Sequence, residues 1–265
     1  MIARAPGPRL APFVSMIWAQ DGSHAVGRER VLPTGQMHLV VRIEGQPVAI
    51  ARTALRGGCD PMPAAVVGGT RDGFYDRVLG GRSSVVGAML RPGAATALLG
   101  APADVLAGAH IALADLWCPA DVAALRERLA EARGEAARLG VFAEALEARL
   151  SAEPSQDFIP FAATWLSRGG SVRALAERVD CSHRHLTERF RAASGLTPKL
   201  FQRLARFNRL IDAMAGSVAA PADLAADHGY ADQAHMIRDF RAFAGVTPAI
   251  YLASRPIEPR HLPLR

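Results

Sequence analysis

Basic side chains gather in residues 168–209, where 10 basic and 3 acidic residues give a net charge of +7. Such a segment can form a surface that attracts a polyanion such as nucleic acid. A solvated helical face would carry the same charges, so charge alone leaves both interpretations open. Within the segment, Arg184, Thr187, Glu188 and Arg191 follow the i, i+3, i+4, i+7 spacing that places side chains on one face of a helix.

This part of the sequence occurs twice. Residues 175–198 read LAERVDCSHRHLTERFRAASGLTP, and residues 224–248 read LAADHGYADQAHMIRDFRAFAGVTP. From His185 and His235 onward, the matching residues lie 50 positions apart. The repeat predicts two copies of one helical unit.

Each copy has the local signals of a helix-turn-helix. A side-chain oxygen from Ser182 or Asp232 can cap the second helix. Gly195 or Gly245 should end that helix, because glycine adopts the left-handed conformation at low cost. A Thr-Pro pair then predicts the start of the next helix, at residues 197–198 and 247–248.

The apolar residues of each second helix lie opposite its polar face. Leu186 and Phe190 in the first copy, and Met236 and Phe240 in the second, should point inward. A longer helix between the copies should hold the two units at a fixed separation through an apolar stripe of Leu200, Leu204, Phe207, Ile211 and Met214.

The segment from about residue 158 to residue 253 resembles the DNA-binding domain of AraC-type transcription regulators. The residues that carry the resemblance best are in the second copy: Ala225, Gly229-Tyr230, Asp232-Gln233, Phe240-Arg241, Gly245, Thr247-Pro248 and Tyr251. The resemblance implies two helix-turn-helix units, each inserting its second helix into the major groove of double-stranded DNA. It also implies RNA polymerase as a partner if the protein is an activator.

We therefore expect the outward faces of the second helices to read bases. The candidates are His183, Arg184, Thr187, Glu188, Gln233, Ala234, Ile237 and Arg238. Arg184 and Arg238 suit bidentate contacts to guanine, and Ala234 and Ile237 suit thymine methyl groups. Glu188 either accepts from cytosine or pairs with an arginine of its own helix.

Other basic residues are expected to contact phosphates, which set affinity and salt dependence rather than sequence choice. These are Arg191, Lys199, Arg203 and Arg241. Residues 210–265 contain 5 basic and 6 acidic residues, a net charge of −1. We therefore expect the first unit and the long helix to supply most of the non-specific attraction to DNA.

The first 90 residues have a different pattern. Met37, Leu39, Val41 and Ile43 alternate with other residues as in a half-buried strand. Frequent Gly and Pro breaks predict a small β-barrel or sandwich.

The fold class that follows is α+β. Residues 1–150 are expected to form a β-rich sensor or dimerisation domain with trailing helices, followed by a linker at residues 151–157. Residues 158–258 are expected to form an all-α DNA-binding domain, with helices and turns only from residue 158 onward.

The N-terminal part has a weaker resemblance to the sensor region of a less-studied branch of AraC-type regulators. It is carried by Val31-Leu32-Pro33-Thr34-Gly35, Arg91-Pro92-Gly93-Ala94 and Leu116-Trp117. A pocket for a small-molecule effector would be lined by Trp18, Met37, Leu39, Val41 and Met89, although core packing explains the same residues. The trailing helices pack within the chain or form a homodimer.

Composition argues against several other classes. Hydrophobic residues make up 50% of the chain, which excludes wholesale disorder. Three separated cysteines form neither a disulfide framework nor a zinc motif, so we expect a cytoplasmic protein. No stretch approaches the ~20 apolar residues that a membrane span needs, so we expect no such span. We expect no enzyme, catalytic residue, metal or cofactor. The alternatives are a cupin-like metal enzyme, for which the paired histidines are missing, and an interaction module without DNA binding.

Overall fold

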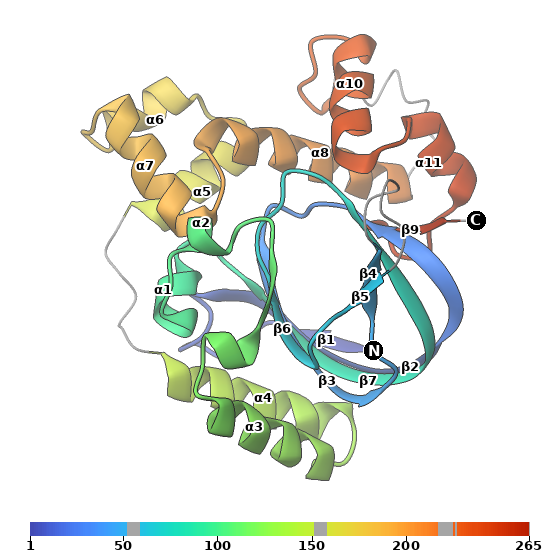
Figure 1. Ribbon diagram of the computed structural model, residues 1–265. Helices are drawn as coiled ribbons and strands as arrows, with labels where there is room; N and C mark the ends of the chain where they lie inside the picture. The colour runs from blue at the N-terminus through green and yellow to red at the C-terminus, as the bar shows by residue number, and fades with distance from the viewer. Residues whose placement is uncertain (52–58, 151–157, 217–224, 226, 265) are drawn as a thin grey trace.

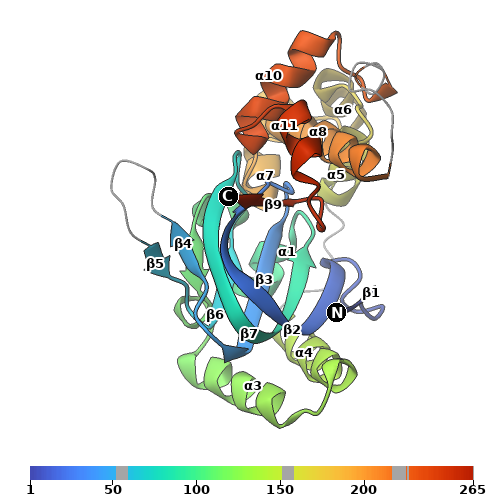
Figure 2. The same cartoon turned by 90° about the vertical axis from the view of Figure 1, so that its right-hand side faces the viewer.

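The computed structural model describes residues 1–51, 59–150, 158–216, 225 and 227–264. A curved β-sheet with helices on one side forms the N-terminal part, and the helices of the C-terminal part lie along one end of that sheet (Figures 1 and 2). This confirms the α+β class. The predicted linker at residues 151–157, and Leu224 and Ala226 of the second copy, fall outside the described residues.

All strand pairings in the sheet are antiparallel, and the central path runs β1-β2-β7-β3-β6-β8. β4 pairs with β5 and β7, and β9 pairs with β2. Among the described strands, β1 and β8 do not pair with each other, so the sheet is open and not a closed barrel. The strands are β1 (Ile2–Arg4), β2 (Val14–Val31), β3 (Met37–Gly45), β4 (Ala49–Ala51), β5 (Cys59–Pro61), β6 (Ala65–Gly68), β7 (Tyr75–Leu90), β8 (His110–Ala112) and β9 (His261–Leu264).

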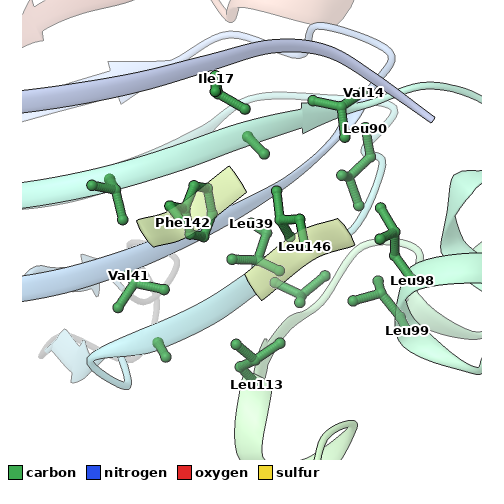
Figure 3. Close-up of a cluster of buried hydrophobic side chains, with 14 of the residues drawn as sticks. Val14, Ile17, Leu39, Val41, Leu90, Leu98, Leu99, Leu113, Phe142 and Leu146 are labelled. Carbon is green, nitrogen blue, oxygen red and sulfur yellow. The ribbon is translucent and has the colours of Figure 1, made fainter. Parts of the chain in front are cut away.

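One face of the sheet is packed against helices. Leu39 and Val41 of β3 are fully buried there, as the period-2 pattern predicts, and Phe142 and Leu146 cover them from α4 (Figure 3). The N-terminal helices are α1 (Ala94–Leu99), α2 (Ala103–Leu106), the 3-10 turn η1 (Leu113–Asp115), α3 (Pro119–Glu131) and α4 (Glu135–Arg149).

The opposite face is concave, and we call it the inner face. Trp18, His38, Tyr75 and His110 belong to it, because each pairs in register with residues that point to the same side. β7 and β8 are separated by β3 and β6 in the sheet order, yet the ring centroids of Tyr75 and His110 are only 4.7 Å apart. The sheet must therefore curl over this face.

The five predicted effector-pocket residues are divided between the two faces. Trp18 and Met89 lie on the inner face, because Trp18 pairs with Gly87 and Met89 pairs with His38. The other three, Met37, Leu39 and Val41, point into the core beneath the helices. These three correspond to the core-packing interpretation, and the five do not line one pocket.

The C-terminal part has a second hydrophobic core that includes both helical units. On α8, the ring of Phe201 contacts that of Phe190 in the first unit, with centroids 5.2 Å apart. The ring of Phe207 contacts that of Phe240 in the second unit, with centroids 5.3 Å apart, and both contacts are edge-on. Both units therefore pack on one helix, as the apolar stripe predicted. The helices are α5 (Ile159–Ser167), α6 (Val172–Arg178), α7 (His183–Ser194), α8 (Pro198–Gly216), α10 (Gln233–Ala244) and α11 (Pro248–Ser254).

The expectation of only helices and turns after residue 158 is wrong at the C-terminus. β9 pairs antiparallel with β2, with His261 opposite Val31 and Leu264 opposite Arg28. The edge of β2 offers unpaired backbone groups, and four residues of the tail satisfy them. The chain thus returns to the N-terminal sheet after completing the second helical unit.

Both helical units contact the N-terminal part at the glycine that ends their second helix. A Cβ placed on Gly195 would collide with Oγ1 of Thr70, and one on Gly245 would collide with the guanidinium of Arg30 and the ring of Phe74. Arg30 also donates to the carbonyl of Ala244 at 3.3 Å. The repeat therefore presents equivalent positions of its two copies to the same neighbouring domain.

The contact at Gly195 predicts the effect of a substitution there. Gly195→Ala introduces a left-handed alanine, which costs ~1–3 kcal/mol, and also a collision with Thr70, which adds ~1–3 kcal/mol. Gly100→Ala is the matched control, because Gly100 has nearly the same backbone conformation (φ 72°, against 77°) and no neighbour within 4 Å. Urea unfolding should show a larger loss for Gly195→Ala. Equal losses of unfolding free energy in the two variants would show that Gly195 is needed only for its left-handed backbone at the helix end and not for the contact with Thr70.

Candidate nucleic-acid interface

α7 and α10 begin and end as their sequences predicted. The Ser182 hydroxyl accepts from the backbone N–H of His185 at 3.1 Å, and the Asp232 carboxylate accepts from that of His235 at 2.6 Å. Gly195 and Gly245 close the helices with φ of 77° and 69°. Because these signals are local in sequence, they hold in both copies.

The outward face of α7 is open to solvent, but its polar side chains interact with other groups of the same helix. Nε of Arg184 donates to Oε1 of Glu188 at 2.8 Å, although the Arg184 side chain is 88% exposed. Of the two interpretations of Glu188, the free protein shows the pairing within the helix. The Thr187 hydroxyl donates to the carbonyl of His183 at 2.8 Å, and its oxygen remains able to accept.

The outward face of α10 is less charged. Gln233, Ala234 and Arg238 are exposed. Ile237 is half-buried and packs against the second core, so only part of its side chain faces outward. The first half of α10 thus presents one amide, one methyl group and one guanidinium.

The four residues predicted to contact phosphates are in two different settings. Arg191, Lys199 and Arg241 are exposed. Arg203 instead donates from Nη2 to Oδ1 of Asp239 at 2.8 Å, and its guanidinium carbon lies 5.1 Å from the centroid of the Phe243 ring. Arg203 therefore has a structural role in joining α8 to α10.

Asp239 is the centre of a charge cluster that the sequence analysis missed. Its carboxylate is 5% exposed and pairs with Arg203 and also with Arg206, whose Nη2 lies 3.0 Å from Oδ2. Arg206 further stacks on Tyr230 at 4.5 Å and lies 3.3 Å from Nε2 of His235. Burial and the nearby Asp239 charge raise the pKa of Tyr230 to about 12, despite the opposing charge of Arg206. The sequence did contain one signal of this cluster, because Asp239 is an acidic residue at a position of α10 that faces the core.

Two kinds of feature are absent from the described residues. They contain no group of three or more His, Cys, Asp or Glu side chains placed to hold a metal ion. No helix within them is both long and apolar enough to cross a membrane.

Comparison with known proteins supports the assignment of the C-terminal part. The family described as "Helix-turn-helix domain" matches residues 175–254, and one described as "Domain of unknown function (DUF6597)" matches residues 3–112. No curated protein matches the chain.

Solved structures of ToxT from Vibrio cholerae are similar to the whole chain at low identity. An apo variant is 10% identical, covers 94% of this chain and 99% of its own, and has a TM-score of 0.48. A second ToxT structure is 10% identical, with coverage of 89% and 98% and a TM-score of 0.47. A third, bound to (E)-4-(8-methylnaphthalen-1-yl)but-3-enoic acid, is 11% identical, with coverage of 89% and 98% and a TM-score of 0.47.

The helix-turn-helix match in the C-terminal part indicates a DNA-binding transcription regulator. Residues 175–254 match a helix-turn-helix domain of AraC type, which confirms the resemblance found in the sequence for this part of the chain.

The Asp239 cluster predicts a stability effect. Asp239→Asn removes the negative charge and leaves two arginines facing each other, which should lower the free energy of unfolding by ~2–3 kcal/mol. This is below the ~3–5 kcal/mol for breaking a fully buried pair, because Arg203 is 39% exposed. Glu177→Gln, in the exposed pair with Arg173, is the control and should cost less than ~0.5 kcal/mol. Urea denaturation measures both, and similar values would contradict a structural role for Asp239.

Proposed function

We propose that the protein recognises a specific DNA sequence by placing α7 and α10 in successive major grooves on one face of the duplex. The observation that carries the proposal is the duplicated helix with matching caps, packed twice on α8. The last residues of α7 and of α10 contact the β-rich part of the chain, whereas the first residues of both helices are exposed. A helix in the major groove reads bases mainly through its N-terminal residues.

The proposed base contacts come from the outward faces of the two helices, where all the side chains are exposed except the half-buried Thr187 and Ile237. On α7 they are His183, Arg184, Thr187 and Glu188, and on α10 they are Gln233, Ala234, Ile237 and Arg238. The pair with Glu188 uses Nε of Arg184, so both terminal nitrogens of the guanidinium can still donate to guanine. Any rearrangement of the pair on binding costs little, because exposed pairs at i and i+4 contribute ~0.3–0.5 kcal/mol. The pair also holds Arg184 extended along the helix before DNA arrives.

The proposed phosphate contacts are unequal between the units. Arg191 and Lys199 are exposed at the C-terminal end of α7 and the start of α8, and Arg241 is the only equivalent residue proposed for α10. The two arginines nearest to α10 on α8 are bound to Asp239. This arrangement supports a larger non-specific attraction from the first unit.

Residues 1–150 are proposed to regulate DNA binding in response to a chemical signal. Through the contacts at Gly195 and Gly245, this part of the chain packs directly against the ends of α7 and α10, the two proposed recognition helices. A ligand regulates only if it binds one arrangement of the two parts better than another. A homodimer, and contact with RNA polymerase, remain predictions.

Selection of fragments from the source genome, followed by footprinting, tests the proposal. We expect a footprint with two protected major grooves about one helical turn apart. Arg184→Ala and Arg238→Ala should each cost ~1–3 kcal/mol of binding free energy and should relax base preference at one groove only. Loss of preference at the same groove in both variants would contradict two-groove reading.

The salt dependence of the same two variants tests the charge asymmetry. Arg184→Ala should lower the slope of affinity against salt more than Arg238→Ala, since the first unit carries most of the positive charge. Equal slopes in the two variants would contradict the asymmetry.

Glu188→Gln separates the two interpretations of this residue. If Glu188 only pairs with Arg184, removing its charge should strengthen binding to all sequences by up to ~1 kcal/mol, because a carboxylate facing phosphates is lost. If it accepts from cytosine, affinity should fall at one base pair only. Titration of the selected fragment and a scrambled fragment measures the difference, with Glu177→Gln as the matched control for the lost charge.

A further inference from the structure

A polar cluster occupies one end of the inner face, away from the predicted DNA contacts. Nη2 of Arg71 lies 2.9 Å from Nδ1 of His110, and the guanidinium carbon of Arg71 lies 5.0 Å from the centroid of the Tyr75 ring. The ring of His110 also contacts Tyr75 edge-on. These residues come from the loop after β6, from β7 and from β8, so the curl of the sheet brings them together.

The cluster contains two buried donors without acceptors. A guanidinium only donates, so Nδ1 of His110 accepts from Arg71 and the ring proton is on Nε2. Nε2 of His110 and Nε of Arg71 are both buried, and neither has a hydrogen-bond partner in the part of the chain that the structure describes. A buried unpaired donor costs ~1–3 kcal/mol. Because the two donors belong to residues that are already hydrogen-bonded to each other, a single acceptor from outside the chain could accept from both.

The charges around the cluster favour an anion. Within the described residues, no ion pair neutralises Arg71, and exposed Asp72 is the nearest acidic neighbour along the sequence. Glu29, the carboxylate on the inner face, is already held by Arg77 and by His261. Among the described residues, the carboxylate that acts on the cation of Arg71 is therefore that of the solvent-exposed Asp72.

The imidazoles of His38 and His110 are neutral at physiological pH. Burial, followed by the charges of Arg77, Arg71 and His261, lowers the pKa of His38 to about 4. Burial, Arg71, His38 and Arg77 lower the pKa of His110 to about 3. His110 thus acts as a neutral donor beside one permanent cation, an arrangement that suits a singly charged oxyanion group.

We propose that Arg71 and His110 bind a small oxyanion, a carboxylate or a phosphate group, whose oxygens accept from Nε–H of Arg71 and Nε2–H of His110. The inference names a ligand for the proposed regulatory role of residues 1–150. The biological role of the site therefore rests on that proposed function. The site differs from the predicted effector pocket, since it shares no residue with that set.

The position of the site connects it to the first recognition helix. Thr70 precedes Arg71, and its hydroxyl faces Gly195 at the end of α7. The carbonyl of Thr70 also accepts from the N–H of Gly108, just before β8 and His110. An anion that fixes Arg71 against His110 therefore acts on the backbone that supports α7.

The test is calorimetric titration of the full chain, without DNA, using inorganic phosphate and acetate as separate probes. Sodium chloride at equal ionic strength gives the background. Arg71→Gln and His110→Phe each remove one of the two donors, and Phe retains a ring beside Tyr75. Arg126→Gln, on the exposed face of α3, is the control for one lost arginine charge.

The wild type and Arg126→Gln should bind at least one probe, and each site variant should bind it at least about tenfold more weakly, as expected for one charge-assisted hydrogen bond. Binding of phosphate alone or acetate alone would identify the oxyanion. No binding by the wild type, or equal binding by all variants (an adventitious ion only), would overturn the site. His110→Phe keeps the test decisive if Arg71→Gln does not fold. Since DNA is absent, failure here leaves the DNA-binding proposal to its own footprinting test.

Discussion

The two left-handed glycines at the ends of α7 and α10 are the constraint on which the rest of the arrangement depends. Each glycine lies where a Cβ would collide with the N-terminal part, so the contact requires a residue without a side chain. The same residue is required for the helix end, because its φ is positive. One choice of amino acid therefore serves local structure and domain contact together, and the duplication repeats it at both helices. The result fixes the C-terminal ends of the helices and leaves their N-terminal ends exposed.

The two units are anchored to α8 by different interactions. The first relies on aromatic and aliphatic packing around Phe190 and Phe201. The second adds a buried carboxylate, Asp239, and draws two arginines of α8 inward. Those arginines are then committed to the fold. With Arg203, Arg206 and Asp239 taken up by the fold, the net charge of residues 168–209 falls from +7 to +5 and that of residues 210–265 rises from −1 to 0. The charge asymmetry on the surface is thus smaller than a count of residues suggests, although it keeps its sign.

Features that depend on neighbours along the sequence were predictable. The caps at Ser182 and Asp232 and the alternation in β3 needed only local spacing, and the structure shows both. Features that depend on distant partners were not. The role of Arg203 depends on Asp239, 36 residues away. The face on which Trp18 lies depends on its pairing with Gly87, and no local pattern gives that register. The strand β9 was missed because four residues at an edge carry little periodic signal.

Two of the three sequence stretches behind the weaker N-terminal resemblance lie at the contact between the two parts. The carbonyl of Pro33 accepts from the Asn208 side chain of α8 at 3.1 Å, and the N–H of Gly93 donates to the carbonyl of Ala193 in α7 at 2.8 Å. These turns therefore hold the DNA-binding helices.

β9 completes the connection by placing His261 3.3 Å from Glu29, beside Arg77 on the inner face. The charged groups of the inner face and the supports of the recognition helices thus share the same short segments of backbone. These segments therefore provide a direct path of contacts between the inner face and the ends of α7 and α10, within an interface that is packed and does not deform continuously.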